Sequence, residues 1–140
     1  MRVNVTFSAN AGVAIAVGKY RIWVDALPTR KQPGFSAAGP RILDDSAFFR
    51  PGHICYTHGH GDHFSEALTR IADQRWPEAK VYLPERILPN QETVAPGNLV
   101  FRDGALTLRF FPLPHEGARY AQVPHYGLLI TVDGCNILAA

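Results

Sequence analysis

Polar and apolar residues alternate at the start of the chain. From residue 3 to residue 8, valine or phenylalanine alternates with asparagine, threonine or serine, and this period of two is typical of a β-strand. An apolar run over residues 11–17 leads through a Gly18-Lys19 turn into a second apolar run over residues 20–24. The pattern therefore predicts the antiparallel start of a sheet, which closes at Asp25.

The middle of the chain predicts one helix between short strands. After an apolar segment at residues 53–56, Ser65 can cap a helix that runs to about Trp76, where Pro77 ends it. Three apolar residues share one face of this helix: Leu68, Ile71 and Ala72. Further elements are predicted as a strand over 80–83, a short helical piece over 85–88, two extended runs around the Asp103-Gly104 turn, and a hairpin of 126–132 and 136–140.

Residues 26–47 differ from the segments on either side. They contain three prolines and show no sustained period, so they predict a long loop. Loops of this length in small domains often contribute to function, and we expect this one to shape a pocket.

Composition sets the class of protein. The chain has 140 residues, 46% of them apolar and 19% charged, with a formal charge of +2, which suits one soluble domain and indicates neither a nucleic-acid nor a membrane partner. No basic leader precedes an apolar block, and no run approaches the roughly 18 apolar residues of a membrane helix. Cys55 and Cys135 are too few for a disulfide framework. We therefore expect a cytoplasmic protein with unpaired cysteines.

The chemistry concentrates in the segment Thr57-His58-Gly59-His60-Gly61-Asp62-His63. It holds three of the chain's six histidines within six positions. On an extended or turning backbone His58 and His60 project to one side, where they can bind the same cation, while Asp62 and His63 point elsewhere. The two glycines leave room for two adjacent metal pockets. A polar surface turn is the alternative, but this density of ligands favours a two-metal hydrolytic site.

The segment resembles the T-H-x-H-x-D-H signature of the metallo-β-lactamase superfamily, and it follows an apolar strand and precedes a helix, as in that family. The stretches IWVDAL, FFPLPHEG and YGLLITVDGCNILAA are similar in order to the family's other elements. The chain looks closest to small hydrolases related to ascorbate-6-phosphate lactonase. The resemblance implies an α/β (α+β) fold, the αββα sandwich, with residues 1–140 forming a single domain that is the N-terminal part, about half, of a longer one.

The resemblance also implies a ligand set. His58, His60 and His115 would bind the first metal, and Asp62 and His63 would belong to the second. Zinc is the expected metal, two ions per intact site, with manganese or iron as alternatives. His125 is the rival to His115 as third ligand. Asp25 is either a hydrogen-bond partner of a ligand histidine or a turn cap.

A hydrolase is the activity that the resemblance implies. A metal-activated hydroxide would attack an ester or lactone of a small molecule, with Asp62 orienting it or accepting its proton. A phosphodiesterase and a non-catalytic remnant that binds one metal are the alternatives. The sequence stops before the family's next Gly-Asp, so we expect apolar residues of the last hairpin to need a cover, for example in a homo-oligomer; these are Leu128, Ile130, Ile137 and Leu138.

Overall fold

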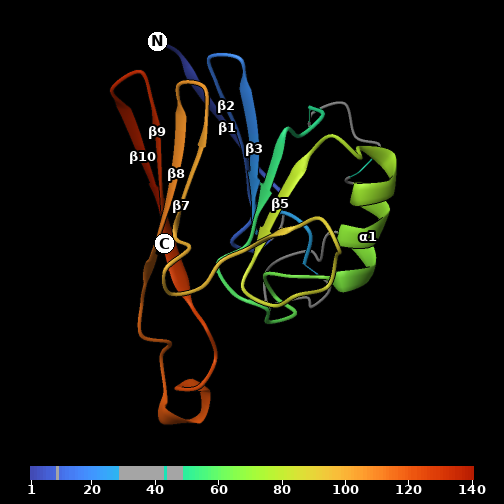
Figure 1. Cartoon of the computed structure of the whole chain (residues 1–140), viewed down its shortest axis with the longest axis vertical. Helices are drawn as coiled ribbons and strands as arrows, with labels where there is room; N and C mark the ends of the chain where they lie inside the picture. Colours follow the sequence, from blue (N-terminus) through green and yellow to red (C-terminus); the bar gives the residue numbers. More distant parts are fainter. Residues whose placement is uncertain (9, 29–42, 44–48) are drawn as a thin grey trace.

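The computed structural model describes residues 1–8, 10–28, 43 and 49–140, and it contains two facing β-sheets with one helix outside (Figure 1). The first sheet has the strand order β1-β2-β3-β4-β5-β6 and the second has the order β10-β9-β8-β7. The first sheet comprises β1 (Val3–Phe7), β2 (Val13–Val17), β3 (Tyr20–Val24), β4 (His53–Cys55), β5 (Lys80–Leu83) and β6 (Glu92–Thr93). The second comprises β7 (Val100–Asp103), β8 (Leu106–Pro112), β9 (Tyr126–Val132) and β10 (Cys135–Ala139).

Strand direction determines where functional side chains can meet. β1, β2 and β3 are antiparallel neighbours, as predicted, and β3 then pairs in parallel with β4, which pairs in parallel with β5. Residues that follow β3 and β4 therefore emerge at the same edge of the sheet. Asp25 and the segment Thr57–His63 lie at that edge because each directly follows one of these strands.

Two apolar clusters hold the layers together. The first lies between the sheets and includes Ile15, Ile22, Leu108, Phe110 and Leu128. The second lies between the first sheet and helix α1 (Glu66–Arg75) and includes Trp23, Ile54, Leu68, Ala72 and Val81. The strands β2 to β5 of the first sheet are thus apolar on both faces, as is typical of strands buried between two layers.

Helix α1 begins and ends as predicted, but one residue of its buried face was predicted wrongly. The Ser65 side chain accepts a hydrogen bond from the Leu68 amide at 3.1 Å, and Trp76 is the C-cap. Ile71, expected with Leu68 and Ala72 on the buried face, is 37% exposed. Thr69 is buried instead, because its hydroxyl pairs with that of Tyr56 and so satisfies a polar group in the core.

The helical piece predicted at residues 85–88 is absent, and that prediction is wrong. This segment consists of bends between two prolines, Pro84 and Pro89. The Gln91 side chain replaces the hydrogen bonds of a helix: its oxygen accepts from the Ile87 and Leu88 amides at 2.8 and 2.9 Å, and its nitrogen donates to the Glu85 carbonyl at 2.8 Å. Most of the predicted long loop over 26–47, namely residues 29–42 and 44–47, lies outside the described residues.

The last hairpin corrects another expectation. Leu128 and Ile130 are completely buried against the first sheet, and Ile137 packs against the same cluster. Of the four residues expected to lack a cover, Leu138 is the exposed one, at 66%. The facing sheets bury the inner side of this hairpin, while a homo-oligomer that covers its outer side stays a prediction. Cys55 and Cys135 are free thiols, as expected. Among the described residues no helix is long and apolar enough to span a membrane.

A single tyrosine hydroxyl connects the two sheets at the far end from Asp25. Tyr20 Oη, at the start of β3, donates to the Asp103 carbonyl at 2.8 Å and accepts from the Ala105 amide at 2.9 Å. We expect Tyr20→Phe to lower the free energy of unfolding by about 1–3 kcal/mol, because both backbone groups lose their partner. Urea denaturation measures this, with Tyr120→Phe as the matched control at a more exposed tyrosine; equal midpoints for wild type and Tyr20→Phe would contradict the assignment.

Candidate metal centre

Three histidines from two distant segments converge at the edge where β3 and β4 end. His58 and His60 come from the segment after β4, and His115 follows β8 in the second sheet. Their ring centroids are 4.9 Å apart for His58 and His60, 5.0 Å for His58 and His115, and 4.8 Å for His60 and His115. One ring nitrogen from each lies within 4.8 Å of the other two. Three imidazoles this close form a set of nitrogen ligands for one divalent metal.

A second group shares His58. One ligand atom each from His58, Asp62 and His63 lies within 4.8 Å of the other two, and His63 Nε2 is 3.6 Å from Asp62 Oδ2. The sequence-predicted residues His58, His60, Asp62, His63 and His115 are therefore all brought together. The two groups are adjacent, which is the arrangement that a two-metal site requires.

The buried carboxylate of Asp25 forms hydrogen bonds with two residues of the histidine-rich segment, Thr57 and His63. Oδ1 accepts from the Thr57 amide at 2.8 Å, and Oδ2 accepts from the Thr57 hydroxyl at 2.7 Å and pairs with His63 Nδ1 at 2.9 Å. Asp25 adopts the left-handed conformation, with φ of 49°, which aspartate tolerates better than most residues. Of the two roles left open by the sequence, the hydrogen bond to a histidine is the one seen.

These hydrogen bonds determine the tautomers of two histidines. An ionised carboxylate only accepts, so the Thr57 hydroxyl donates to Asp25 and accepts from His58 Nδ1, 2.9 Å away. His63 Nδ1 donates to Asp25 in the same way. Both histidines therefore keep a lone pair at Nε2, which is the form that binds a metal.

The electrostatics of the two histidines differ. Burial, together with the neighbouring histidines, lowers the pKa of His58 to about 3, so this ring is neutral at pH 7. Burial also acts to lower the pKa of His63, but the hydrogen bond and charge of Asp25, with the charge of Asp62, outweigh it and raise that pKa. Asp25 thus makes the His63 ring more basic and a better electron donor.

His125 lies in the same cluster. Its ring centroid is 4.6 Å from that of His58 and 5.1 Å from that of His115, and its Nδ1 is buried without a hydrogen-bond partner in the described part of the chain. Burial and the nearby His115 lower the pKa of His125. His125 is absent from both ligand groups formed by the described residues, so it lies beside the ligands.

We expect His115→Ala to weaken metal binding about 10-fold or more, and His125→Ala to weaken it less. The reason is that only the His115 ring provides a nitrogen that converges with those of His58 and His60. Titration of the metal-free variants with zinc measures the two affinities. Equal effects, or a larger effect of His125→Ala, would make His125 the third ligand.

Two neighbours of the cluster were not predicted from the sequence. The Tyr120 ring centroid lies 5.0 Å from that of His60 and 5.1 Å from that of His115, on the short 3₁₀ helix η2 (Ala118–Tyr120). The Glu85 carboxylate lies so close to Gly59 that a Cβ there would be 2.8 Å from it, and burial raises the pKa of Glu85. Neither residue belongs to a recognisable motif. For Glu85, the one feature of the sequence that could have indicated a role is its position directly after the strand β5.

Comparisons with known proteins identify the fold. No model of a known protein family matches the sequence, and no curated protein is significantly similar to it. Among solved structures, Igni18, a metallo hydrolase from the archaeon Ignicoccus hospitalis, matches with a TM-score of 0.64 at 21% identity, over 99% of this chain and 60% of its own. The metallo-β-lactamase fold protein YhfI from Bacillus subtilis matches with a TM-score of 0.60 at 14% identity, over 92% and 55%.

A third match has a different described activity. CmlA, a diiron β-hydroxylase from Streptomyces venezuelae, has a TM-score of 0.64 at 17% identity and matches 99% of this chain and 29% of its own. The chain thus has the metallo-β-lactamase fold, which confirms the predicted fold class, and it spans between 29% and 60% of the length of these three proteins. At such identities the likeness extends to the fold and not to the substrate.

Proposed function

We propose that this chain, with its metallo-β-lactamase fold, is part of a metal-dependent hydrolase of that superfamily. The observation that carries the proposal is the convergence of the two ligand groups, His58-His60-His115 and His58-Asp62-His63, on one edge of the sheet. The described activity of Igni18 as a metallo hydrolase supports the same class. A relationship to ascorbate-6-phosphate lactonase remains a prediction from the sequence motif.

The donor set fits divalent metals. It combines four imidazoles, of which those of His58 and His63 are held as suitable tautomers, with one carboxylate, and this mixture suits zinc while also accepting iron or manganese. The diiron site named for CmlA makes iron a specific alternative. When bound, such metals polarise a substrate oxygen and make water acidic enough to attack near pH 7. His58, His60 and His115 would hold one ion and Asp62 and His63 the other.

The chain's own residues divide the remaining work. Asp62 lies at the surface of the cluster, with a side chain 23% exposed, and we assign it the role of orienting the attacking water and accepting its proton. Asp25 and Thr57, both buried, keep the rings of His58 and His63 in place. His125 and Tyr120 border the histidines and are positioned to contact a substrate.

For the substrate we favour a small ester or lactone. The balanced net charge of +2 provides no strong attraction for a polyanion, which argues against nucleic-acid phosphodiesters. A phosphodiesterase and a non-catalytic protein that binds one metal are the competing functions. The metal content of the purified protein separates the last of these: one ion or none per chain favours it, and two favour the hydrolase.

The activity test compares substrates and one variant. We expect metal-loaded, full-length protein to hydrolyse aryl esters or lactones faster than bis(p-nitrophenyl) phosphate, and Asp62→Asn to lower kcat/KM by about 100-fold, since a general base contributes on this scale. Asp133→Asn, at an exposed turn, is the matched control and should leave kcat/KM unchanged. Faster cleavage of the phosphodiester would favour the competing enzyme, and equal rates for Asp62→Asn and wild type would remove Asp62 from the mechanism.

A further inference from the structure

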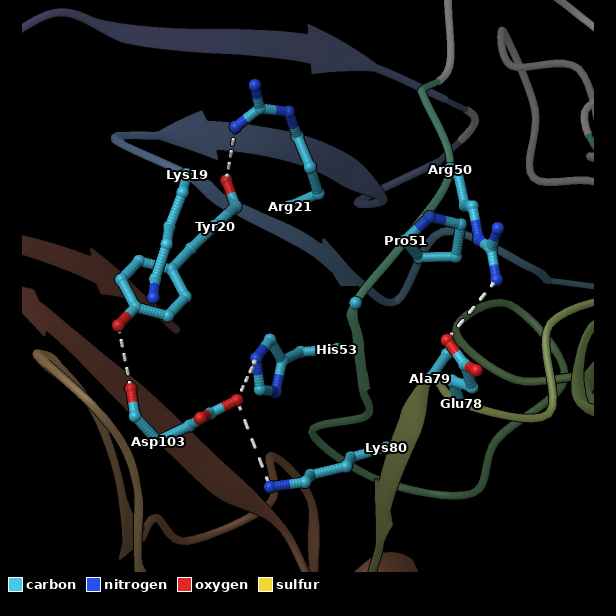
Figure 2. A pocket seen from close by; sticks show the side chains of 11 residues that line it. Lys19, Tyr20, Arg21, Arg50, Pro51, His53, Glu78, Ala79, Lys80 and Asp103 are labelled. Carbon is cyan, nitrogen blue, oxygen red and sulfur yellow. Dashed lines mark hydrogen bonds and ion pairs between the residues drawn. The ribbon is translucent and has the colours of Figure 1, made fainter.

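A cavity lies at the opposite end of the first sheet from the metal centre. It is formed where β3, β4 and β5 begin, at Tyr20, His53 and Lys80, and its volume is about 390 Å³. Figure 2 shows these side chains around an open space, with Asp103 of β7 reaching in from the second sheet. The predicted ligands His58 to His63 follow the other end of β4, and Asp25 follows the other end of β3. The cavity is therefore separate from the proposed active site.

Positive charge predominates around this cavity. Four cationic side chains line it, against two carboxylates, those of Glu78 and Asp103; the cations are Lys19, Arg21, Arg50 and Lys80. The excess is considerable for a chain whose formal charge is only +2 in total. Cationic walls around a concave site concentrate anions, because the field adds up within the hollow.

The cations differ in how firmly they are held. Arg21 Nη1 donates to the carbonyls of Gly18 and Tyr20, both at 2.9 Å, so its charge stays in place. The ion pairs of Arg50 with Glu78 and of Lys80 with Asp103 are both 3.8 Å long, and all four partners are at least 46% exposed. Exposed pairs of this kind contribute little stability. Arg50 and Lys80 can therefore turn toward a ligand at small cost.

Lys19 extends over an aromatic wall. Its Nζ lies 5.5 Å from the centroid of the Tyr20 ring, and Figure 2 shows the ammonium group over that ring. The floor is rigid: His53, 4% exposed, pairs with Tyr82 Oη at 3.0 Å and with Asp103 Oδ2 at 3.3 Å. Pro51 and Ala79 complete the wall. A ligand there meets cations at the rim and apolar surface on the sides.

We propose that this cavity binds a small organic phosphate, with the phosphate group attracted by the mobile cations that line it, Lys19, Arg50 and Lys80, and the organic part against Tyr20 and Pro51. The volume falls within the range of small-molecule sites, and two or more flexible cations suit a phosphate dianion. No role was assigned to His53 from the sequence. In this cavity, His53 orients Asp103 and forms the floor. The proposal is independent of the hydrolase activity, since no metal ligand takes part.

The test is an NMR titration of the full-length, ¹⁵N-labelled protein with glycerol 3-phosphate, with glycerol as the uncharged control. We expect saturable shifts of the Lys19, Gly52 and Lys80 amides, with half-saturation on the order of 1 mM or below, and no shift with glycerol. Lys19→Gln/Arg50→Gln should weaken binding about 10-fold, because two charge-assisted contacts are lost. Glu78→Gln should strengthen it a few-fold, since this exposed carboxylate competes for Arg50.

Two controls separate this site from others. Arg70→Gln removes an exposed cation of α1 that pairs with Glu66, and His60→Ala removes a predicted metal ligand; binding should be unchanged in both. Absence of saturable shifts, shifts centred on Gly59 and Gly61, or equal weakening by Arg70→Gln would overturn the proposal. Loss of glycerol 3-phosphate binding in His60→Ala would also overturn the proposal, because it would show that the phosphate binds at the metal centre.

Discussion

The double substitution His58→Ala/His60→Ala is expected to reduce bound metal from a stoichiometric amount to near zero. His58 belongs to both ligand groups and His60 to the first, so their loss leaves His115 alone in one group and Asp62 with His63 in the other. Neither remainder can close a coordination sphere of about four ligands. Elemental analysis of the purified variant measures the loss, and activity should fall with it by about 1,000-fold or more.

Folding must be monitored in the same experiment. His53→Gln is the matched control, because it replaces a buried histidine that is 4% exposed but lies at the other end of the sheet. It should retain metal even if it melts at a lower temperature. A folded His58→Ala/His60→Ala protein with wild-type zinc content would disprove the ligand assignment.

Asp25→Ala is expected to be the most damaging substitution outside the ligand groups. It removes the acceptor for the Thr57 amide, the Thr57 hydroxyl and His63 Nδ1 at once, and leaves buried donors without partners. We expect the free energy of unfolding to fall by about 3–5 kcal/mol, and metal affinity to fall about 10- to 100-fold because the ligand rings are no longer oriented.

The two effects of Asp25→Ala can be separated. Asp25→Asn keeps the shape of the side chain and one acceptor oxygen, so it should recover part of the stability while metal affinity stays low. Chemical denaturation and zinc titration of both variants provide the comparison. Metal affinity equal to wild type in Asp25→Asn would show that the carboxylate is structural only.

Local signals in the sequence predicted most of the fold. The turn at Gly18, the cap at Ser65 and the stop at Pro77 each act over a few residues, and the hairpins and helix that they delimit are confirmed. The errors arose where a distant or unusual contact decided the outcome. The Gln91 side chain makes the hydrogen bonds that a helix at residues 85–88 would have made. Thr69, which pairs with Tyr56, occupies the buried face of α1, and Ile71 faces solvent.

In the candidate site, too, residues that are close in sequence were predicted, whereas those that come from distant segments were harder to predict. His58, His60, Asp62 and His63 are close in sequence, so a motif could reveal them. Asp25, Glu85 and Tyr120 come to the cluster from other strands and loops, and their contacts exist only after the sheets have formed. His115 and His125 are isolated histidines; His115 was preferred as a ligand because of the family resemblance, and its ring nitrogen converges with those of His58 and His60.

We infer that a metal binds between His58, His60 and His115. Anomalous X-ray diffraction from crystals of the full-length protein, grown with zinc and measured on both sides of the zinc absorption edge, tests it most directly. We predict an anomalous peak about 2.0–2.1 Å from one ring nitrogen of each histidine, with a second peak beside Asp62 and His63. Crystals that contain zinc elsewhere, and no anomalous density among these three rings, would contradict it.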